Sequence, residues 1–98
     1  LRELDPRTGE MKRMFVRDEY RRRGIARQLI DAVETRAREL GYDTLRLETG
    51  DGQPEAIALY LSAGYRAIPP FGPYVGNIYS RCFEKRLPPA APHIRQPM

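Results

Sequence analysis

The sequence is poor in cysteine and histidine, and it contains no tryptophan. Because Cys82 is the single cysteine, the chain cannot form an internal disulfide, which is typical of a reducing compartment. One cysteine and one histidine, His93, cannot supply a metal site of the Cys/His type, although a site of carboxylates alone stays open. No stretch approaches the ~20 apolar residues of a membrane span, and no signal peptide begins the chain. We therefore expect a cytoplasmic protein without a resident metal.

Lysine is also scarce, since arginine supplies 15 of the 17 basic side chains, and the formal net charge is +4. A basic domain can attract nucleic acid or any other polyanion. The densest cluster is Arg21–Arg23, and the other arginines are scattered along the chain. No zinc finger, RNP motif or helix-turn-helix spacing accompanies the cluster, and a phosphate-rich cofactor accounts for it without nucleic acid. Neither nucleic acid nor a membrane is therefore an expected partner.

The length of 98 residues, of which 41% are hydrophobic, suits one domain with a modest core. Hydrophobic patterns that predict helices and strands occur throughout residues 1–87. From Pro88 onward the chain is rich in proline and alanine, so we expect residues 88–98 to form a disordered tail. The predicted organisation is one domain over residues 1–87, without internal repeats.

Hydrophobic periodicity predicts a β-α-β unit in the first half of the chain. The apolar run Met11–Val16 indicates a strand, and Thr44–Thr49 alternates as a strand does. Between them, apolar residues recur every three or four positions over Ile25–Leu40, which is the spacing of one helix face. That face consists of Ala26, Leu29, Ile30, Val33, Ala37 and Leu40. The order strand, helix, strand favours a right-handed crossover between parallel strands.

The outer face and the end of this predicted helix also have recognisable patterns. Glu34 and Arg38 have the i, i+4 spacing of an ion pair on the outer face. Gly41 follows in the position that a left-handed residue usually takes after a helix. Both features support a helix that ends near residue 40.

Shorter elements are expected on either side of the β-α-β unit. Leu1–Leu4 has the pattern of a strand end, and the turn residues Asp5–Gly9 would join it to the next strand as a hairpin. A second helix would begin at Pro54 and end at Gly64. The final strand is predicted at 78–85, after a proline-rich segment at 68–74 that cannot be regular structure.

The segment Arg21–Ala26 joins the first strand of the unit to its helix. A glycine turn that opens a helix directs several unpaired backbone N–H groups, and the positive end of the helix dipole, toward one point. That point suits a phosphate or pyrophosphate. Gly24 lets a ligand approach the backbone closely because it has no Cβ. Taken alone, the segment is equally consistent with a solvated turn that ends in a capping glycine.

Two blocks of residues carry a family pattern. The first is Val16, Arg21, Gly24 and Ala26, and the second is Gln53–Tyr60 followed by Ala63-Gly64-Tyr65. Over residues 11–87 the chain resembles the GCN5-related N-acetyltransferase (GNAT) superfamily, whose cofactor motif is Arg/Gln-x-x-Gly-x-Gly/Ala and whose second helix carries Ala-x-x-Leu-Tyr. The resemblance implies an α/β fold. Its GNAT-like mixed sheet would comprise the hairpin, the β-α-β cofactor unit and the C-terminal strand, with the second helix packed beside it.

Family members normally carry a strand and two helices before the hairpin, and this sequence begins within the hairpin. The resemblance therefore implies a fragment of a longer protein or a shortened, N-terminally truncated member. An uncovered first strand would expose unpaired backbone groups at the edge of the sheet. We accordingly expect a homodimer that covers this edge.

The resemblance also implies transfer of an acetyl group from acetyl-CoA to an amine by direct attack. Backbone groups of Met14, Phe15 and Val16 would bind the pantetheine arm. Backbone amides of residues 22–27 would bind the pyrophosphate. Tyr60 matches the family tyrosine that faces the coenzyme A sulfur, so it is the expected acid for the leaving thiolate. The implied cofactor-binding residues are Met14, Phe15, Val16, Arg21, Arg22, Arg23, Gly24, Ile25, Ala26, Arg27, Gln53 and Tyr60.

Glu48 is the predicted general base. A lysine-like amine has a pKa near 10.4 and needs a base, and Glu48 lies toward the carboxyl end of the second parallel strand, where ligand crevices form. Alternatively, Glu48 faces outward and pairs with Arg46 or a neighbour, and Tyr60 is a core aromatic. Three positions depart from the family pattern. Asp18 stands where many relatives have proline, and Gln53 where many have asparagine. Ala26 replaces the second glycine, a substitution that the family accepts.

Other functions stay open at this point. One is a coenzyme A-binding module without catalysis, and another is a nucleic-acid-binding domain that uses Arg21–Arg23. The sequence does not identify the acceptor amine. The loop Phe71–Tyr74 either helps to form the acceptor surface or is an ordinary surface loop.

Overall fold

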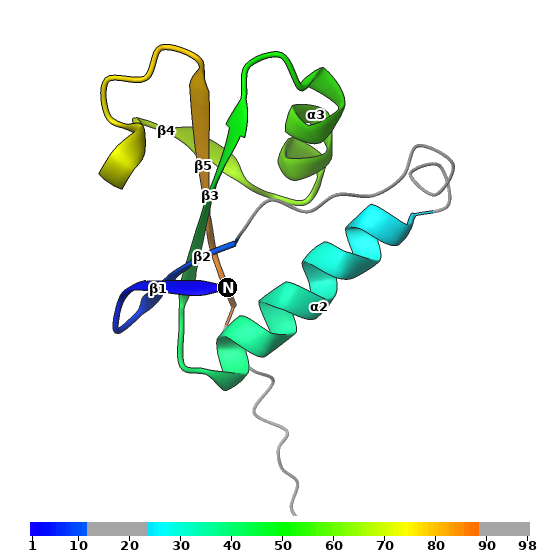
Figure 1. Cartoon of the computed structure of the whole chain (residues 1–98). Helices are drawn as coiled ribbons and strands as arrows, with labels where there is room; N and C mark the ends of the chain where they lie inside the picture. The colour runs from blue at the N-terminus through cyan, green and yellow to red at the C-terminus, as the bar shows by residue number, and fades with distance from the viewer. Residues whose placement is uncertain (12–23, 89–98) are drawn as a thin grey trace, which may run out of the picture.

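A computed structural model describes residues 1–11 and 24–88, and within them five strands form one mixed sheet in the order β1-β2-β3-β5-β4 (Figure 1). The elements are β1 (Arg2–Asp5), β2 (Thr8–Glu10), α2 (Ile25–Glu39), β3 (Thr44–Gly50), α3 (Pro54–Ser62), β4 (Arg66–Ile68), the 3-10 helix η1 (Gly72–Tyr74) and β5 (Ser80–Arg86). The predicted α/β class with a mixed sheet is confirmed. The tail expected at 88–98 lies outside the described residues except for Pro88, so it stays a prediction.

The β-α-β unit is present, because β2 and β3 are parallel neighbours and α2 lies between them in the chain. All other strand pairs are antiparallel. The first strand of the unit was predicted at Met11–Val16, whereas β2 ends at Glu10 and Met11 adds one further hydrogen bond, from its N–H to the Arg46 carbonyl at 2.8 Å. Residues 12–16 lie outside the described residues, so that part of the strand stays a prediction.

The hairpin turn is shorter than the predicted Asp5–Gly9. Pairing resumes at Thr8, and Gly9 is a buried strand residue opposite Leu45. A Cβ added to Gly9 would lie 3.0 Å from Cδ2 of Tyr42. The glycine therefore serves close packing of the Tyr42 ring against the strand rather than the turn.

The end of α2 confirms the predicted role of Gly41, which has φ 93°. Its N–H donates to the Arg38 carbonyl, and the Tyr42 N–H donates to the Ala37 carbonyl, both at 3.0 Å. These are the two hydrogen bonds of a Schellman motif, which satisfies carbonyls that the helix end leaves free.

The predicted outer-face pair between Glu34 and Arg38 is wrong. Glu34 is buried, and its carboxylate accepts hydrogen bonds from Lys85 Nζ at 3.0 and 3.1 Å and from the Tyr65 hydroxyl at 3.0 Å. Arg38 donates instead to Thr35 Oγ1. The buried face of α2 is accordingly shifted toward Glu34, and two residues of the predicted apolar face, Leu29 and Leu40, are exposed. Glu34 thus pairs with a cation on β5 instead of one on its own helix.

The second half of the chain confirms α3, which begins at Pro54 and is followed by Gly64 with φ 97°. The segment 68–74 is not wholly irregular as predicted, because Ile68 belongs to β4 and residues 72–74 form η1. The last strand begins at Ser80 rather than residue 78. Its Cys82 is a buried strand residue.

The two faces of the sheet have different covers. Figure 1 shows α2 and α3 on one side and the yellow turn of η1 on the other. Alternate residues of β3 divide between them: Leu45 and Leu47 join the core beneath the helices, and Arg46 lies against Phe71 just before η1. We call these the helix face and the loop face. No helix among the described residues has the length and apolar character needed to cross a membrane.

Candidate functional site

The N-terminus of α2 has the geometry expected for an anion seat. Gly24 is the N-cap residue, with φ 77° and ψ 10°, which is the left-handed region that favours glycine. The N-cap glycine has no side chain to cap this helix end, and the first turn contains no acidic residue. Among the described residues, the end therefore combines the positive pole of the helix dipole with backbone N–H groups that its N-cap residue does not occupy.

Two further predicted cofactor residues follow Gly24 in α2. Ile25 is half-buried and Ala26 is buried, so their side chains pack inward and leave only their amides for a ligand. The other predicted cofactor residues of this segment lie outside the described residues. They are Met14, Phe15, Val16, Arg21, Arg22 and Arg23. Their assignment stays a prediction.

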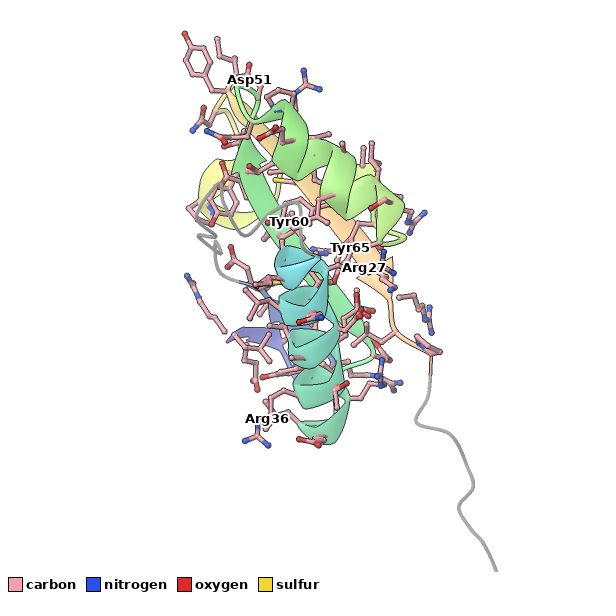
Figure 2. The ribbon with its side chains drawn as sticks, turned by 90° about the vertical axis from the view of Figure 1, so that its right-hand side faces the viewer. Arg27, Arg36, Asp51, Tyr60 and Tyr65 are labelled. Atoms are coloured by element: carbon pink, nitrogen blue, oxygen red, sulfur yellow. The ribbon has the colours of Figure 1, made fainter. Side chains whose placement is uncertain are left out.

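Arg27 connects the start of α2 to the end of α3. Its Nη1 donates to the Ser62 carbonyl at 3.4 Å, and its Nε lies 3.5 Å from Asp31 Oδ1. Figure 2 shows Arg27 beside Tyr60 and Tyr65, where the two helices approach each other. The side chain thus contacts the end of α3, and the backbone amide is the part of Arg27 predicted to bind pyrophosphate.

Tyr60 lies in the core on the helix face, 6% exposed. Its ring centroid is 6.0 Å from that of Tyr65, in an edge-to-face arrangement, and 6.3 Å from that of Phe83. The alternative of a core aromatic therefore describes its packing, and its role toward coenzyme A stays a prediction. Gln53 is exposed at the N-cap of α3, where its side chain makes no capping hydrogen bond.

Glu48, the predicted base, lies on the loop face. It is half-buried and accepts a hydrogen bond from Ser80 Oγ at 2.7 Å. The alternative pairing with Arg46 does not occur, because Arg46 Nε donates to Glu84 Oε1 at 2.9 Å. Glu48 also lies opposite Cys82 in the sheet register, and burial is the main cause that raises the pKa of that thiol. The structure therefore surrounds Glu48 with hydroxyl and thiol groups.

Glu10 is a second carboxylate on the loop face, and the sequence analysis missed it. It is the last residue of β2, lies opposite Arg46 in the register and is only 2% exposed. Its Oε2 accepts a hydrogen bond of 2.7 Å from the Tyr74 hydroxyl. The signal in the sequence was a single carboxylate between Gly9 and Met11, but the strand was placed after it.

The pKa of the Tyr74 hydroxyl is affected by the charged groups on the loop face. Its pKa is raised to about 12, and its hydrogen bond to Glu10 is the largest cause. Burial comes next, followed by the charges of Glu10, Glu48 and Cys82. Glu10 and Glu48 are therefore close enough to act on one phenol. Since β2 and β3 are parallel, both carboxylates lie toward the carboxyl ends of their strands, where α2 also begins.

Comparison with known proteins shows which family the sequence and the fold resemble. The acetyltransferase (GNAT) family matches residues 1–65. An IAA acetyltransferase of Azospirillum brasilense is 44% identical over 79 residues, which are 81% of this chain and 52% of that protein. An uncharacterised N-acetyltransferase of Bacillus subtilis is 38% identical over 89 residues, or 89% of this chain and 59% of that protein. The chain thus spans little more than half the length of these relatives.

Solved structures share the fold. An acyl-CoA N-acyltransferase assigned in Klebsiella pneumoniae is 41% identical, with a TM-score of 0.76 over 80% of this chain and 54% of that one. An Elizabethkingia anophelis acetyltransferase, solved with acetyl-CoA bound, is 21% identical, with a TM-score of 0.72 over 87% of this chain and 64% of that one. The family match covers well over half of the described fold. The chain belongs to the acetyltransferase (GNAT) family.

Proposed function

We propose that this protein transfers an acetyl group from acetyl-CoA to the nitrogen of an amine. The observation that carries the proposal is the N-terminus of α2, where the N-cap residue Gly24 has φ 77° and no side chain of its own to occupy the backbone N–H groups. The N-terminus of a helix can bind a phosphate group through its free backbone N–H groups and the positive end of the helix dipole. The acetyl-CoA bound by the Elizabethkingia relative supports the choice of donor.

The two faces of the sheet suggest a division of roles. Tyr60 lies on the helix face together with the proposed pyrophosphate seat, and we assign it to protonation of the departing thiolate. The carboxylates lie on the loop face, where an acceptor amine could approach the thioester from the opposite side. We assign Glu10 as the general base, because a buried carboxylate with a neutral partner is suited to accepting a proton. Glu48 is the alternative base.

The proposal is tested by titrating acetyl-CoA into the full-length protein by calorimetry, followed by turnover assays with a panel of amines. Gly24→Glu places bulk and negative charge in the proposed seat and should weaken binding at least about tenfold. Gly41→Glu is a matched control. Gly24 and Gly41 flank the same helix, both have positive φ, and neither has a described atom within 4 Å of an added Cβ.

The wild type and the two variants together distinguish the possible outcomes. Both substitutions force a left-handed side chain, which costs roughly 1–2 kcal/mol in each, so only a loss confined to Gly24→Glu identifies the anion seat. Equal effects of the two variants would contradict it. Binding without turnover on any amine would favour the coenzyme A-binding module instead.

We further propose that the protein is a cytoplasmic homodimer. The support for self-association is β1, which lies at the edge of the described sheet and offers backbone groups to another strand. Sedimentation of the full-length protein checks the assembly, and a concentration-independent monomer would contradict it.

A further inference from the structure

The carboxylate of Glu10 lies beneath Tyr74. Glu10 is 2% exposed, whereas Tyr74 is half-buried, and the Tyr74 hydroxyl donates to Oε2 of Glu10 at 2.7 Å. An amine that reaches the loop face therefore meets the Tyr74 oxygen before it meets the carboxylate. Among the described residues, the Tyr74 hydroxyl is the group through which Oε2 of Glu10 can exchange a proton with such an amine.

The position of Tyr74 is fixed by its own loop. Its ring packs edge-to-face against Phe71 at 5.3 Å between centroids, and Phe71 in turn carries the Arg46 guanidinium 5.4 Å from its centroid. Gly72, with φ 54°, supplies the backbone turn between the two aromatic residues. The hydroxyl is thus held over Glu10 by contacts that do not depend on the hydrogen bond itself.

The groups that face the Tyr74 hydroxyl keep it protonated. Glu10 faces it from β2, Glu48 from β3 and Cys82 from β5, and together with burial they raise its pKa to about 12. Arg46, which lies opposite Glu10 in the sheet register, pairs with Glu84. At neutral pH the phenol is therefore a donor to Glu10, and its oxygen retains a lone pair that can accept a second proton.

We propose that Tyr74 relays the proton between the acceptor amine and Glu10, which makes it a catalytic residue of the reaction; this inference rests on the proposed function. As the amine lone pair forms the C–N bond, the N–H proton passes to the Tyr74 oxygen and the Tyr74 hydroxyl proton passes to Oε2 of Glu10. The C–S bond breaks, and its electron pair leaves on sulfur. The thiolate takes its proton from Tyr60, which regains one from solvent. Glu10 releases its proton to solvent, and Tyr74 is unchanged.

The test is Tyr74→Phe in the full-length protein, which removes the hydroxyl and keeps the ring. We expect kcat to fall by about 10- to 100-fold, within the range of general acid–base contributions, with an unchanged dissociation constant for acetyl-CoA. The matched control is Tyr42→Phe, which removes another tyrosine-to-glutamate hydrogen bond, from Tyr42 to Glu3 at 3.2 Å in the N-terminal hairpin. Its kcat should equal that of the wild type.

A second measurement does not depend on turnover. Ultraviolet titration of the tyrosines should show one that ionises near pH 12 and moves to lower pH in Glu10→Gln. A kcat within twofold of the wild type in Tyr74→Phe, or no change in the titration, overturns the relay while the proposed function stands. A wild type that binds acetyl-CoA but acetylates no amine overturns both.

Discussion

The helix face and the loop face of the sheet each bury a glutamate, but they give it different partners. On the helix face, Glu34 receives the ammonium of Lys85 and the hydroxyl of Tyr65. On the loop face, Glu10 is still less exposed, yet its described partner is the neutral hydroxyl of Tyr74. Burial is therefore similar on the two faces, and the supply of a counter-ion is what distinguishes them.

This difference separates a structural carboxylate from a candidate functional one. Removing a carboxylate from water is costly unless a cation or several donors compensate it. The Lys85 ammonium lies 3.0 Å from Glu34 Oε2 and also donates to the Ala63 carbonyl at 2.9 Å, so that pair ties β5, α2 and the end of α3 together. Glu10 lacks such compensation among the described residues, which is typical of groups retained for chemistry.

The largest effect expected is the loss of turnover in Glu10→Gln. The amide keeps an oxygen for the Tyr74 hydroxyl but cannot accept a proton, so kcat should fall by about 10² to 10⁴-fold. The free energy of unfolding should change by less than ~1 kcal/mol, because a neutral amide is cheaper to bury than a carboxylate. Steady-state kinetics and urea unfolding measure the two quantities.

Glu48→Gln is the matched control for this assignment, because it changes the other carboxylate of the loop face and keeps the acceptor for Ser80 Oγ. A modest effect on kcat is expected. If Glu48→Gln abolishes turnover and Glu10→Gln does not, Glu48 is the base and the contrast between the faces has no catalytic meaning.

The next effect is on stability and concerns the helix face. Lys85→Met leaves Glu34 buried without its cation and should lower the free energy of unfolding by about 3–5 kcal/mol. Adding Glu34→Gln should recover most of this loss, because the double variant buries no charge and keeps an acceptor for Tyr65. Urea unfolding measures both. A loss below ~1 kcal/mol in Lys85→Met would mean that water compensates Glu34 and that the two faces do not differ.

The smallest expected effect is on the free energy of unfolding. It concerns the ion pair between Arg66 and Glu84 at the exposed end of the loop face. Burial alone would raise the pKa of Glu84, but hydrogen bonds and charges from Arg46 and Arg66 outweigh it and lower that pKa below 4.5. Since the pKa is lower in the folded protein, Glu84 stabilises the fold above its ordinary pKa, and this contribution is lost as the pH falls through the lowered value.

Arg66→Ala should therefore cost less than ~1 kcal/mol at neutral pH, because the Arg66 side chain is 76% exposed and solvent screens the pair. The difference from the wild type should vanish in acid. Unfolding curves at several pH values check this, and a difference that persists in acid would show that Arg66 acts through packing instead of charge.

Local patterns in the sequence were sufficient for the regular elements. The three- and four-residue spacing located α2, proline and glycine located the ends of α3, and alternation located β3, because each of these signals depends only on neighbouring residues. Short-range reasoning failed at Gly9, whose small size serves the Tyr42 ring across the sheet. It also failed at 66–68, where β4 is defined mainly by pairing with β5.

The candidate site divides in the same way. The position of Gly24 at the start of the helix was predicted from the sequence, and Gly24 is the N-cap residue of α2. Its role toward a cofactor stays a prediction. The partners of charged side chains were decided by the tertiary structure. Glu34 was assigned to Arg38, one turn away, but pairs with Lys85, 51 residues later. Glu10 accepts a hydrogen bond from Tyr74, which lies 64 residues later in the sequence. Helix spacing and turn geometry are local, whereas burial brings together charges and hydroxyls that no sequence distance relates.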